Sequence, residues 1–222
     1  AGVEAFLEAA GLSWPVPGEG PYLARQGRVE LEASSGRRAP DAPLATLILG
    51  HGSYLEAAPD YLPWAARNGY AGVFFHTTTE VLALGAVPLK AYEARRALVL
   101  PLARRLGLEL ELGGHGLSAL LPRSLFKAEP ELFRLQEGRR RPDANLCPSS
   151  PRALEVVSAN FSAFVAAHPE VEVFHVWPDD LPGGGWCECP ACAGMGPAAQ
   201  SLAVARALAA TLERERPGAR LS

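Results

Sequence analysis

Short apolar runs alternate with longer amphipathic stretches along most of the chain. The runs have the length and continuous apolar character of strands that are buried on both faces. They are residues 44–50, 71–75, 108–113, 171–177 and 219–221. The stretches between them have the length and periodicity of helices, at residues 54–68, 90–106, 151–167 and 197–216. This alternation predicts βαβ units built around a parallel sheet.

Local signals mark the ends of the predicted helices. Ser149 and Ser150 precede Pro151, which supplies an N-cap followed by a proline in the first helical turn. Gly69 and Gly107 follow their helices at the place where a left-handed C-cap is expected. The helix boundaries therefore agree with the apolar pattern.

The number of units limits the choice of α/β fold. A closed (β/α)8 barrel needs eight βα units and typically about 250 residues, and only about four and a half units are visible here. The pattern predicts either an open sheet or the first half of a TIM-type barrel. Because the chain stops at Ser222 inside an apparent strand, we expect the half barrel, at residues 41–222.

The first forty residues do not follow the βα rhythm. Residues 1–10 have one apolar face and predict a helix, and residues 15–38 are rich in turn formers. We therefore expect residues 1–40 to be the end of a preceding domain with a linker.

Composition excludes several classes of protein. The 222 residues are 48% hydrophobic, which is enough for a packed core and excludes a disordered chain. With 21 basic and 24 acidic residues, the net charge of −3 provides no basic field for nucleic acid or a membrane surface. No apolar run approaches the roughly 18–20 residues of a membrane-spanning helix. No signal peptide is visible, and a secreted or periplasmic location stays compatible with the sequence.

Histidines follow three of the predicted strands. His51, His76 and His115 end the first, second and third strand, and Trp177 lies at the end of the fourth. Ligands of parallel α/β folds meet the carboxyl ends of the strands, so we expect these four side chains to line a substrate site. The alternatives are histidines that only bond the ends of their strands and a tryptophan buried in the core.

Two carboxylates follow Trp177 in the chain. Asp179 and Asp180 are candidates for general acid and base, because neighbouring like charges can raise one pKa towards neutrality. The same residues belong to a Pro-, Asp- and Gly-rich stretch that could be only a turn. Glu109 and Glu111 alternate with leucines, and one of them could face a barrel interior, although an exposed strand face is the default expectation.

Cysteines give the sharpest local signal. Cys187, Cys189 and Cys192 form a C-x-C-x-x-C motif after the fourth strand, and Cys147 ends the loop after the third. Both loops lie on one side of a βα array, so all four thiols could meet around a structural Zn²⁺. A disulfide in an oxidising compartment and a redox pair or free thiols remain alternatives.

Several motifs resemble a large bacterial family of glycoside-hydrolase-like domains of unknown function. The string from His175 to Asp180, followed by Gly-Trp-Cys-Glu-Cys-Pro-Ala-Cys ending at Cys192, resembles its strand-four signature. Residues 121–140 resemble its P-E-x-F … G-K-R loop, and residues 146–151 resemble its L-C-x-S-N-P helix entry. Residues 3–18 are similar to the end of the small α/β domain that precedes such barrels.

The resemblance implies a barrel related to those of β-hexosaminidases and α-glucuronidases. Some members are endo-β-N-acetylglucosaminidases that act on N-glycans, so an oligosaccharide is the implied partner. Hexosaminidase barrels place an Asp-Glu pair at the end of strand four, where this chain has Asp179 and Asp180.

Three functions remain in view. The first is a carbohydrate-active barrel segment that uses carboxylate acid/base catalysis, with the second carboxylate outside this chain. The second is a non-catalytic carbohydrate-binding or structural barrel, in which open strand edges would favour self-association. The third is a hydrolase whose metal is bound by His51, His76 and His115.

Overall fold

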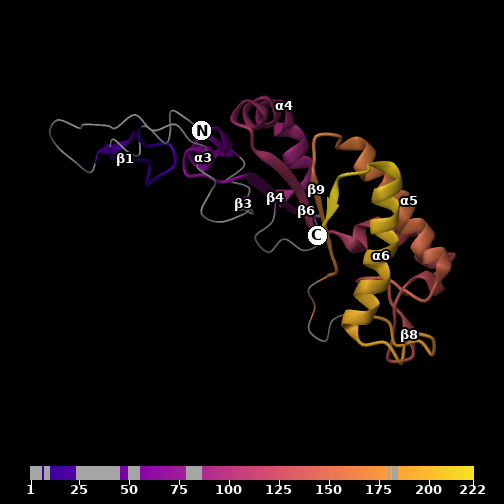
Figure 1. Ribbon diagram of the computed structural model, residues 1–222. Helices are drawn as coiled ribbons and strands as arrows, with labels where there is room; N and C mark the ends of the chain where they lie inside the picture. Colours follow the sequence, from indigo (N-terminus) through magenta and orange to yellow (C-terminus); the bar gives the residue numbers. More distant parts are fainter. Residues whose placement is uncertain are drawn as a thin grey trace.

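The computed structural model describes residues 7, 11–23, 46–49, 56–78, 87–179, 181 and 185–222. Its centre is a parallel sheet in which successive strands lie side by side in chain order (Figure 1). The strands are β3 (Thr46–Leu49), β4 (Gly72–Thr78), β6 (Glu109–His115), β9 (Val173–Trp177) and β10 (Arg220–Leu221). A short β5 (Val87–Pro88) pairs with the end of β4. The predicted parallel α/β architecture is confirmed.

Four helices connect these strands, close to where the apolar pattern predicts them. They are α3 (Ala58–Arg67), α4 (Leu89–Leu106), α5 (Pro151–Ala167) and α6 (Pro197–Glu215). Ser150 caps α5, because its hydroxyl accepts a hydrogen bond from the backbone of Ala153 at 3.3 Å. Gly69 and Gly107 have φ of 78° and 69°, which confirms the left-handed positions expected after α3 and α4.

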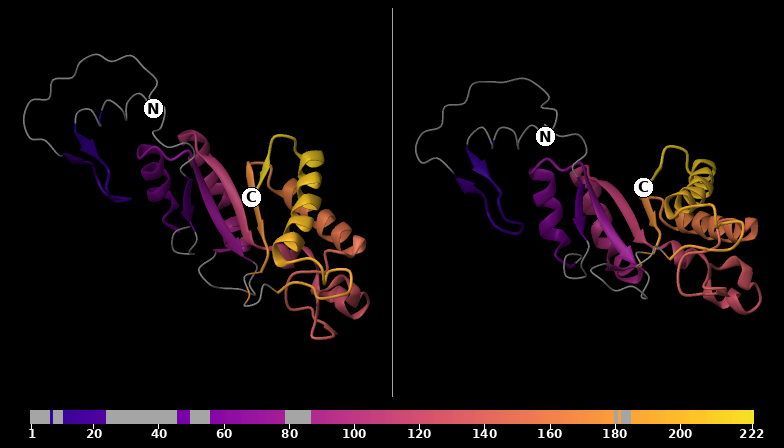
Figure 2. Two further views of the ribbon diagram at one scale, coloured as in Figure 1. Left: turned by 60° about the horizontal axis from the view of Figure 1, so that its bottom comes forward. Right: turned by 90° about the horizontal axis from the view of Figure 1, so that it is seen from below.

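Alternate residues of the strands face opposite sides of the sheet. Val73 and Phe75 of β4, Leu112 of β6 and Phe174 of β9 belong to the core that also contains apolar side chains of the helices. Figure 2 shows the sheet and these helices in two further views. Residues of the other parity, such as Phe74 and His175, lie on the opposite face, where their rings stack. We call this second surface the inner face, because it would line the interior if the sheet closed into a barrel.

Barrel closure is not shown. The described strands form an open sheet with β3 and β10 at its two edges. The TIM-type half barrel therefore stays a prediction, whereas its repeated βα order is present.

The segment between β6 and α5 has more structure than its sequence pattern predicts. It contains three 3₁₀ turns and a small antiparallel hairpin. These are η1 (Leu117–Leu120), η2 (Arg123–Lys127), η3 (Pro130–Leu132), β7 (Leu135–Gln136) and β8 (Arg139–Arg140). Glu137 and Gly138, with φ of 51° and 73°, form the turn between β7 and β8.

A second hairpin, β1 (Leu12–Ser13) with β2 (Tyr22–Leu23), lies near the N-terminus. It is attached to α3 through Trp14, whose carbonyl accepts a hydrogen bond from Trp64 Nε1 at 2.7 Å. The helix predicted at residues 1–10 lies outside the described residues except at position 7. Within the described chain, no helix is long and apolar enough to cross a membrane.

Candidate functional site

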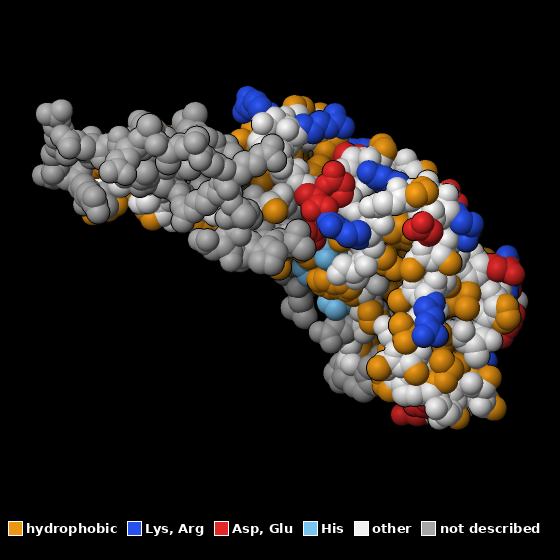
Figure 3. All heavy atoms as spheres, in the orientation of Figure 1, with side chains coloured by type: hydrophobic (Ala, Val, Ile, Leu, Met, Phe, Trp, Pro, Cys, Tyr) orange, Lys and Arg blue, Asp and Glu red, His pale blue; other side chains and the backbone are white. Residues whose placement is uncertain are grey.

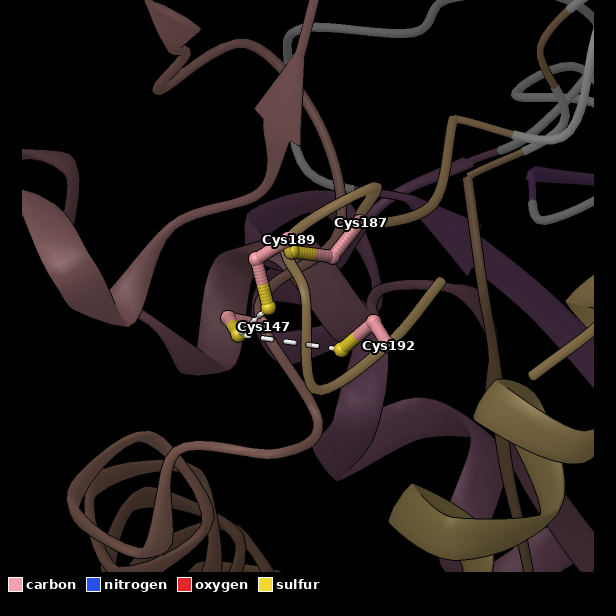
Figure 4. A group of neighbouring side chains, drawn as sticks. All are labelled: Cys147, Cys187, Cys189 and Cys192. Atoms are coloured by element: carbon pink, nitrogen blue, oxygen red, sulfur yellow. Dashed lines mark hydrogen bonds between the residues drawn. The ribbon is translucent and has the colours of Figure 1, made fainter. Parts of the chain in front are cut away.

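The four cysteines converge from two loops (Figure 4). Cys147 comes from the loop after β6, and Cys187, Cys189 and Cys192 come from the loop after β9. All four are buried free thiols, and their sulfur atoms lie within 4.8 Å of one another. The Cys147 sulfur is 3.7 Å from that of Cys189 and 3.9 Å from that of Cys192. The cluster could therefore hold a metal ion.

Hydrogen-bond donors surround these sulfur atoms. The backbone N–H of Leu135, at the start of β7, donates to Cys187 Sγ at 3.3 Å. The Arg140 guanidinium, in β8, approaches the same sulfur at 3.7 Å. Ser149 Oγ lies 3.2 Å from Cys147 Sγ and accepts a hydrogen bond from the Cys192 thiol at 3.2 Å. The contacts of Leu135 and Arg140 with Cys187 stabilise negative charge on sulfur, which is the form that binds a metal.

The thiols of Cys187 and Cys189 differ in pKa. Burial raises the pKa of Cys187 to about 12. Burial alone would also raise the pKa of Cys189, but hydrogen bonds from Ser149, Cys192 and Cys187 lower it to about 6. Cys189 thus loses its proton to an incoming cation more readily than Cys187 does.

The alternatives for the cysteines fit the geometry less well. A disulfide needs two sulfur atoms about 2.0 Å apart, and the separations here are those of free thiols. A redox pair needs its first cysteine at a helix N-terminus, but α6 begins at Pro197, beyond Cys192. Among the described residues, these four cysteines are the one group that could hold a metal ion.

A second cluster lies on the inner face, at the carboxyl ends of the strands. The Trp177 ring has three imidazoles around it, with ring centroids 5.3 Å away for His76, 5.2 Å for His115 and 5.4 Å for His175. In the space-filling view, histidine side chains lie close together at the surface (Figure 3). The predicted convergence of His76, His115 and Trp177 is what the structure shows.

His175 belongs to this cluster and is absent from the predicted site. Its Nε2 lies 2.7 Å from Glu111 Oε2, and Thr46 donates to the other oxygen of that carboxylate at 2.8 Å. Glu111 is therefore largely buried, with its side chain 13% exposed, which corrects the expectation of an exposed strand face. Period-two alternation places His175 on the same face as Trp177, and this signal could have identified it.

Two of the imidazoles have distinct electrostatic surroundings. Burial lowers the pKa of His76, and the neighbouring His115 and His175 lower it further. His115 Nδ1–H donates to the carbonyl of Pro178 at 2.7 Å, so its Nε2 carries the lone pair when the ring is neutral. The neutral form of His76 is thus favoured beside Trp177, and the ring of His115 is oriented by its hydrogen bond to Pro178.

The family model of a domain of unknown function, DUF4838, matches residues 89–219. This chain belongs to the DUF4838 family. The match covers more than half of the chain and includes all four cysteines, His115, His175, Trp177 and both aspartates. His51 and His76 lie before the matched segment. No curated protein matches the chain.

Asp179 of this DUF4838 domain is a buried carboxylate, and both of its oxygens accept hydrogen bonds. Ser118 donates to its Oδ1 at 2.8 Å, and the backbone N–H of Asn145 donates to its Oδ2 at 2.8 Å. The guanidinium of Arg123 lies close enough to interact with this charge and is itself largely buried. Asp179 therefore joins the loop after β6 to the end of β9.

Two predicted site residues, His51 and Asp180, lie outside the described residues. Their roles stay predictions. Strand β8 brings Arg140 to Cys187, a contact that the sequence analysis did not anticipate. Because hairpins of two residues per strand leave little periodicity, the sequence gives no clear signal for this contact.

Proposed function

We propose that this DUF4838 chain is a zinc-braced, glycoside-hydrolase-like domain that acts on an oligosaccharide at its inner face. The observation that carries the proposal is the ring of three imidazoles around Trp177 at the carboxyl ends of β4, β6 and β9. The resemblance of the strand-four and cysteine motifs to glycoside-hydrolase-like domains supports it. Glycans with β-linked N-acetylglucosamine are the substrates that this resemblance implies.

The chemistry of the inner face suits a sugar. An indole offers a broad apolar surface for the C–H face of a pyranose and a polar edge beside it. The imidazoles of His76 and His115 offer hydrogen-bonding nitrogens for hydroxyl groups.

Hydrolysis of a glycosidic bond normally requires two carboxylates. Both oxygens of Asp179 already accept hydrogen bonds from Ser118 and Asn145. We therefore assign Asp179 to positioning the strand-four loop and the general-acid role to Asp180. The second carboxylate would come from outside this chain.

Zinc is the metal that the cysteine cluster fits best. Four thiolates at Zn–S distances of about 2.3 Å form a tetrahedron whose edges are about 3.8 Å. The sulfur separations of 3.7 Å and 3.9 Å from Cys147 match that edge. Because all four positions are filled by sulfur, the ion would have a structural role, and it would hold the loops after β6 and β9 together.

Titration calorimetry with a chitooligosaccharide and with an N-glycan core tests the carbohydrate site. Binding should weaken at least tenfold in Trp177→Ala, because the stacking surface is lost. Trp64→Phe is the matched control, since Trp64 contacts the N-terminal hairpin and should leave affinity unchanged. Absence of binding to every oligosaccharide, or equal affinity of Trp177→Ala and the wild type, would overturn the proposal.

A non-catalytic carbohydrate-binding domain is the second candidate, and the structural role of Asp179 favours it. Glycan cleavage by the protein that is lost in Asp180→Asn would support the hydrolase. Glycan binding without cleavage would support the binding domain. For the third alternative, the described residues include no group of three histidines that could hold a metal ion, and His51 lies outside them.

A further inference from the structure

Cys147 and Cys189 come from different loops, and their sulfur atoms lie 3.7 Å apart. Cys147 ends the loop after β6, and Cys189 lies in the loop after β9. The side chain of Cys189 points toward Cys147 in Figure 4, and the contact from Cys147 to Cys192 is longer, at 3.9 Å. A bond between the sulfur atoms of Cys147 and Cys189 would therefore join the two loops covalently.

Hydrogen bonds that involve no sulfur atom already hold these two loops side by side. Asn145 and Asp179 exchange two hydrogen bonds, and the backbone N–H of Glu188 donates to the carbonyl of Leu135 at 2.7 Å. These contacts keep the loops adjacent whether or not a metal is bound. Rotation of the two cysteine side chains can then shorten the sulfur separation from 3.7 Å to the about 2.0 Å of a disulfide.

The competing pairs both use Cys192. The Cys192 thiol donates a hydrogen bond to Ser149 Oγ at 3.2 Å. A disulfide from Cys192 to Cys189 or to Cys147 would remove the thiol proton on which this hydrogen bond depends. A bond between Cys147 and Cys189 leaves it in place, so this pairing keeps more of the folded arrangement.

We propose that Cys147 and Cys189 form a disulfide when the chain, free of metal, meets a small-molecule disulfide such as oxidised glutathione. The thiol of one cysteine attacks the sulfur–sulfur bond of oxidised glutathione, and one glutathione leaves with the thiol proton. The second cysteine attacks the mixed disulfide, the bond between the two cysteines forms, and the other glutathione leaves with the second proton. Two protein thiols are thus oxidised and one glutathione disulfide is reduced.

This disulfide and the proposed zinc ion are alternative ways of joining the same two loops. The disulfide itself needs no metal, and only its exchange with zinc rests on the zinc site proposed above. The bond removes two of the four zinc ligands, and a bound zinc ion would occupy both sulfur atoms. The loops would thus stay joined in oxidising surroundings without zinc and in reducing surroundings with it.

Peptide mapping by mass spectrometry tests the pairing. The purified chain is equilibrated with a chelator in a mixture of reduced and oxidised glutathione, and its free thiols are then blocked. Exchange is reversible and local opening of the loops gives access to the sulfur atoms, so the most stable pairing accumulates. Cleavage after Glu188 separates Cys187 from Cys189 and Cys192, and fragmentation distinguishes the last two. We expect the main cross-link to join Cys147 to Cys189.

Cys192→Ser and Cys147→Ser are matched variants, because each removes one thiol of the cluster. Cys192→Ser should keep the cross-link, and Cys147→Ser should lose it. The cross-linked wild type should unfold at a higher urea concentration than the reduced, metal-free wild type. Zinc added in place of the chelator should suppress the cross-link. A cross-link that zinc does not affect would count against the zinc site and would leave the disulfide supported.

Three results on the wild type would overturn the proposal. They are a main bond that pairs Cys189 with Cys192, a main bond that pairs Cys147 with any cysteine other than Cys189, and the absence of a cross-link. A cross-linked chain that unfolds at no higher urea concentration than the reduced chain would also overturn it. Because these results are read on the wild type, the test does not depend on the folding of either variant.

Discussion

Asp179 and Asn145 form two hydrogen bonds with each other. The backbone N–H of Asn145 donates to Asp179 Oδ2 at 2.8 Å, and the backbone N–H of Asp179 donates to Asn145 Oδ1 at 3.0 Å. The Asn145 side chain also donates to the carbonyl of Gly185 at 3.1 Å. One reciprocal contact thus joins the loop that carries Cys147 to the loop that carries the other three cysteines.

Substitution of Asp179 should lower the free energy of unfolding, and the loss should be larger when more of its hydrogen bonds are removed. Asp179→Ala leaves the buried N–H of Asn145 without its acceptor and should cost about 2–4 kcal/mol in the free energy of unfolding. Asp179→Asn keeps one oxygen for Asn145 and can donate to Ser118, so it should cost about 1 kcal/mol. Urea denaturation measures both, and equal losses for the two variants would contradict this role.

Gly114 should be intolerant of any side chain. Its φ is 138°, and an added Cβ would lie 2.3 Å from His76 Cδ2. Gly114→Ala should therefore cost about 2–4 kcal/mol and displace His76 from Trp177. Gly116→Ala is the control, because its Cβ would meet no atom closer than 3.9 Å. Thermal unfolding of the two variants checks this, and a Gly114→Ala protein as stable as Gly116→Ala would show that the close contact is absent.

The repeated βα order could be predicted because it depends on local signals. Apolar runs indicated the strands, and Ser150, Gly69 and Gly107 marked helix ends that the structure confirms. The structure of the loop after β6 could not be predicted in the same way. Its 3₁₀ turns and hairpin are too short for periodicity, and they are fixed by long-range contacts such as that between Leu135 and Cys187.

A fall in pH should destabilise the folded chain, because His76 becomes protonated more readily in the unfolded chain. Burial, together with His115 and His175, places its pKa in the folded chain below the usual 6.5. The unfolded chain therefore binds a proton at His76 more readily than the folded chain does. The contribution of His76 to the free energy of unfolding is complete above pH 6.5 and is lost as the pH falls towards the lowered pKa of the folded chain. An NMR titration should give a midpoint below 6.5 for His76, and denaturation should show a smaller acid loss in His76→Phe. A midpoint at or above 6.5 would contradict the burial of this ring.

Removal of one cysteine should release the metal. Cys192→Ser should bind substoichiometric zinc, because an alcohol is a poor ligand in a thiolate site. Ser149→Ala is the control, since Ser149 contacts the sulfur atoms but is not expected to coordinate the ion. Plasma mass spectrometry of the two purified variants measures the difference. Full zinc occupancy in Cys192→Ser would exclude a four-cysteine site.

The candidate site was only partly visible in the sequence. The C-x-C-x-x-C spacing and the strand-end positions of His76, His115 and Trp177 follow from local pattern and strand order. The roles of Glu111 and Asp179 do not, because each depends on a partner from another strand or loop: His175 for Glu111, and Asn145 for Asp179.

The central claim is that a zinc ion bound by the four cysteines holds the loops after β6 and β9 together. The most direct test is the metal content of the purified wild-type chain, measured together with a titration of its free thiols. We expect about one zinc ion per chain and four thiols that react only after denaturation and chelation. A metal-free protein with four freely reactive thiols, or with fewer than four because a disulfide has formed, would contradict it.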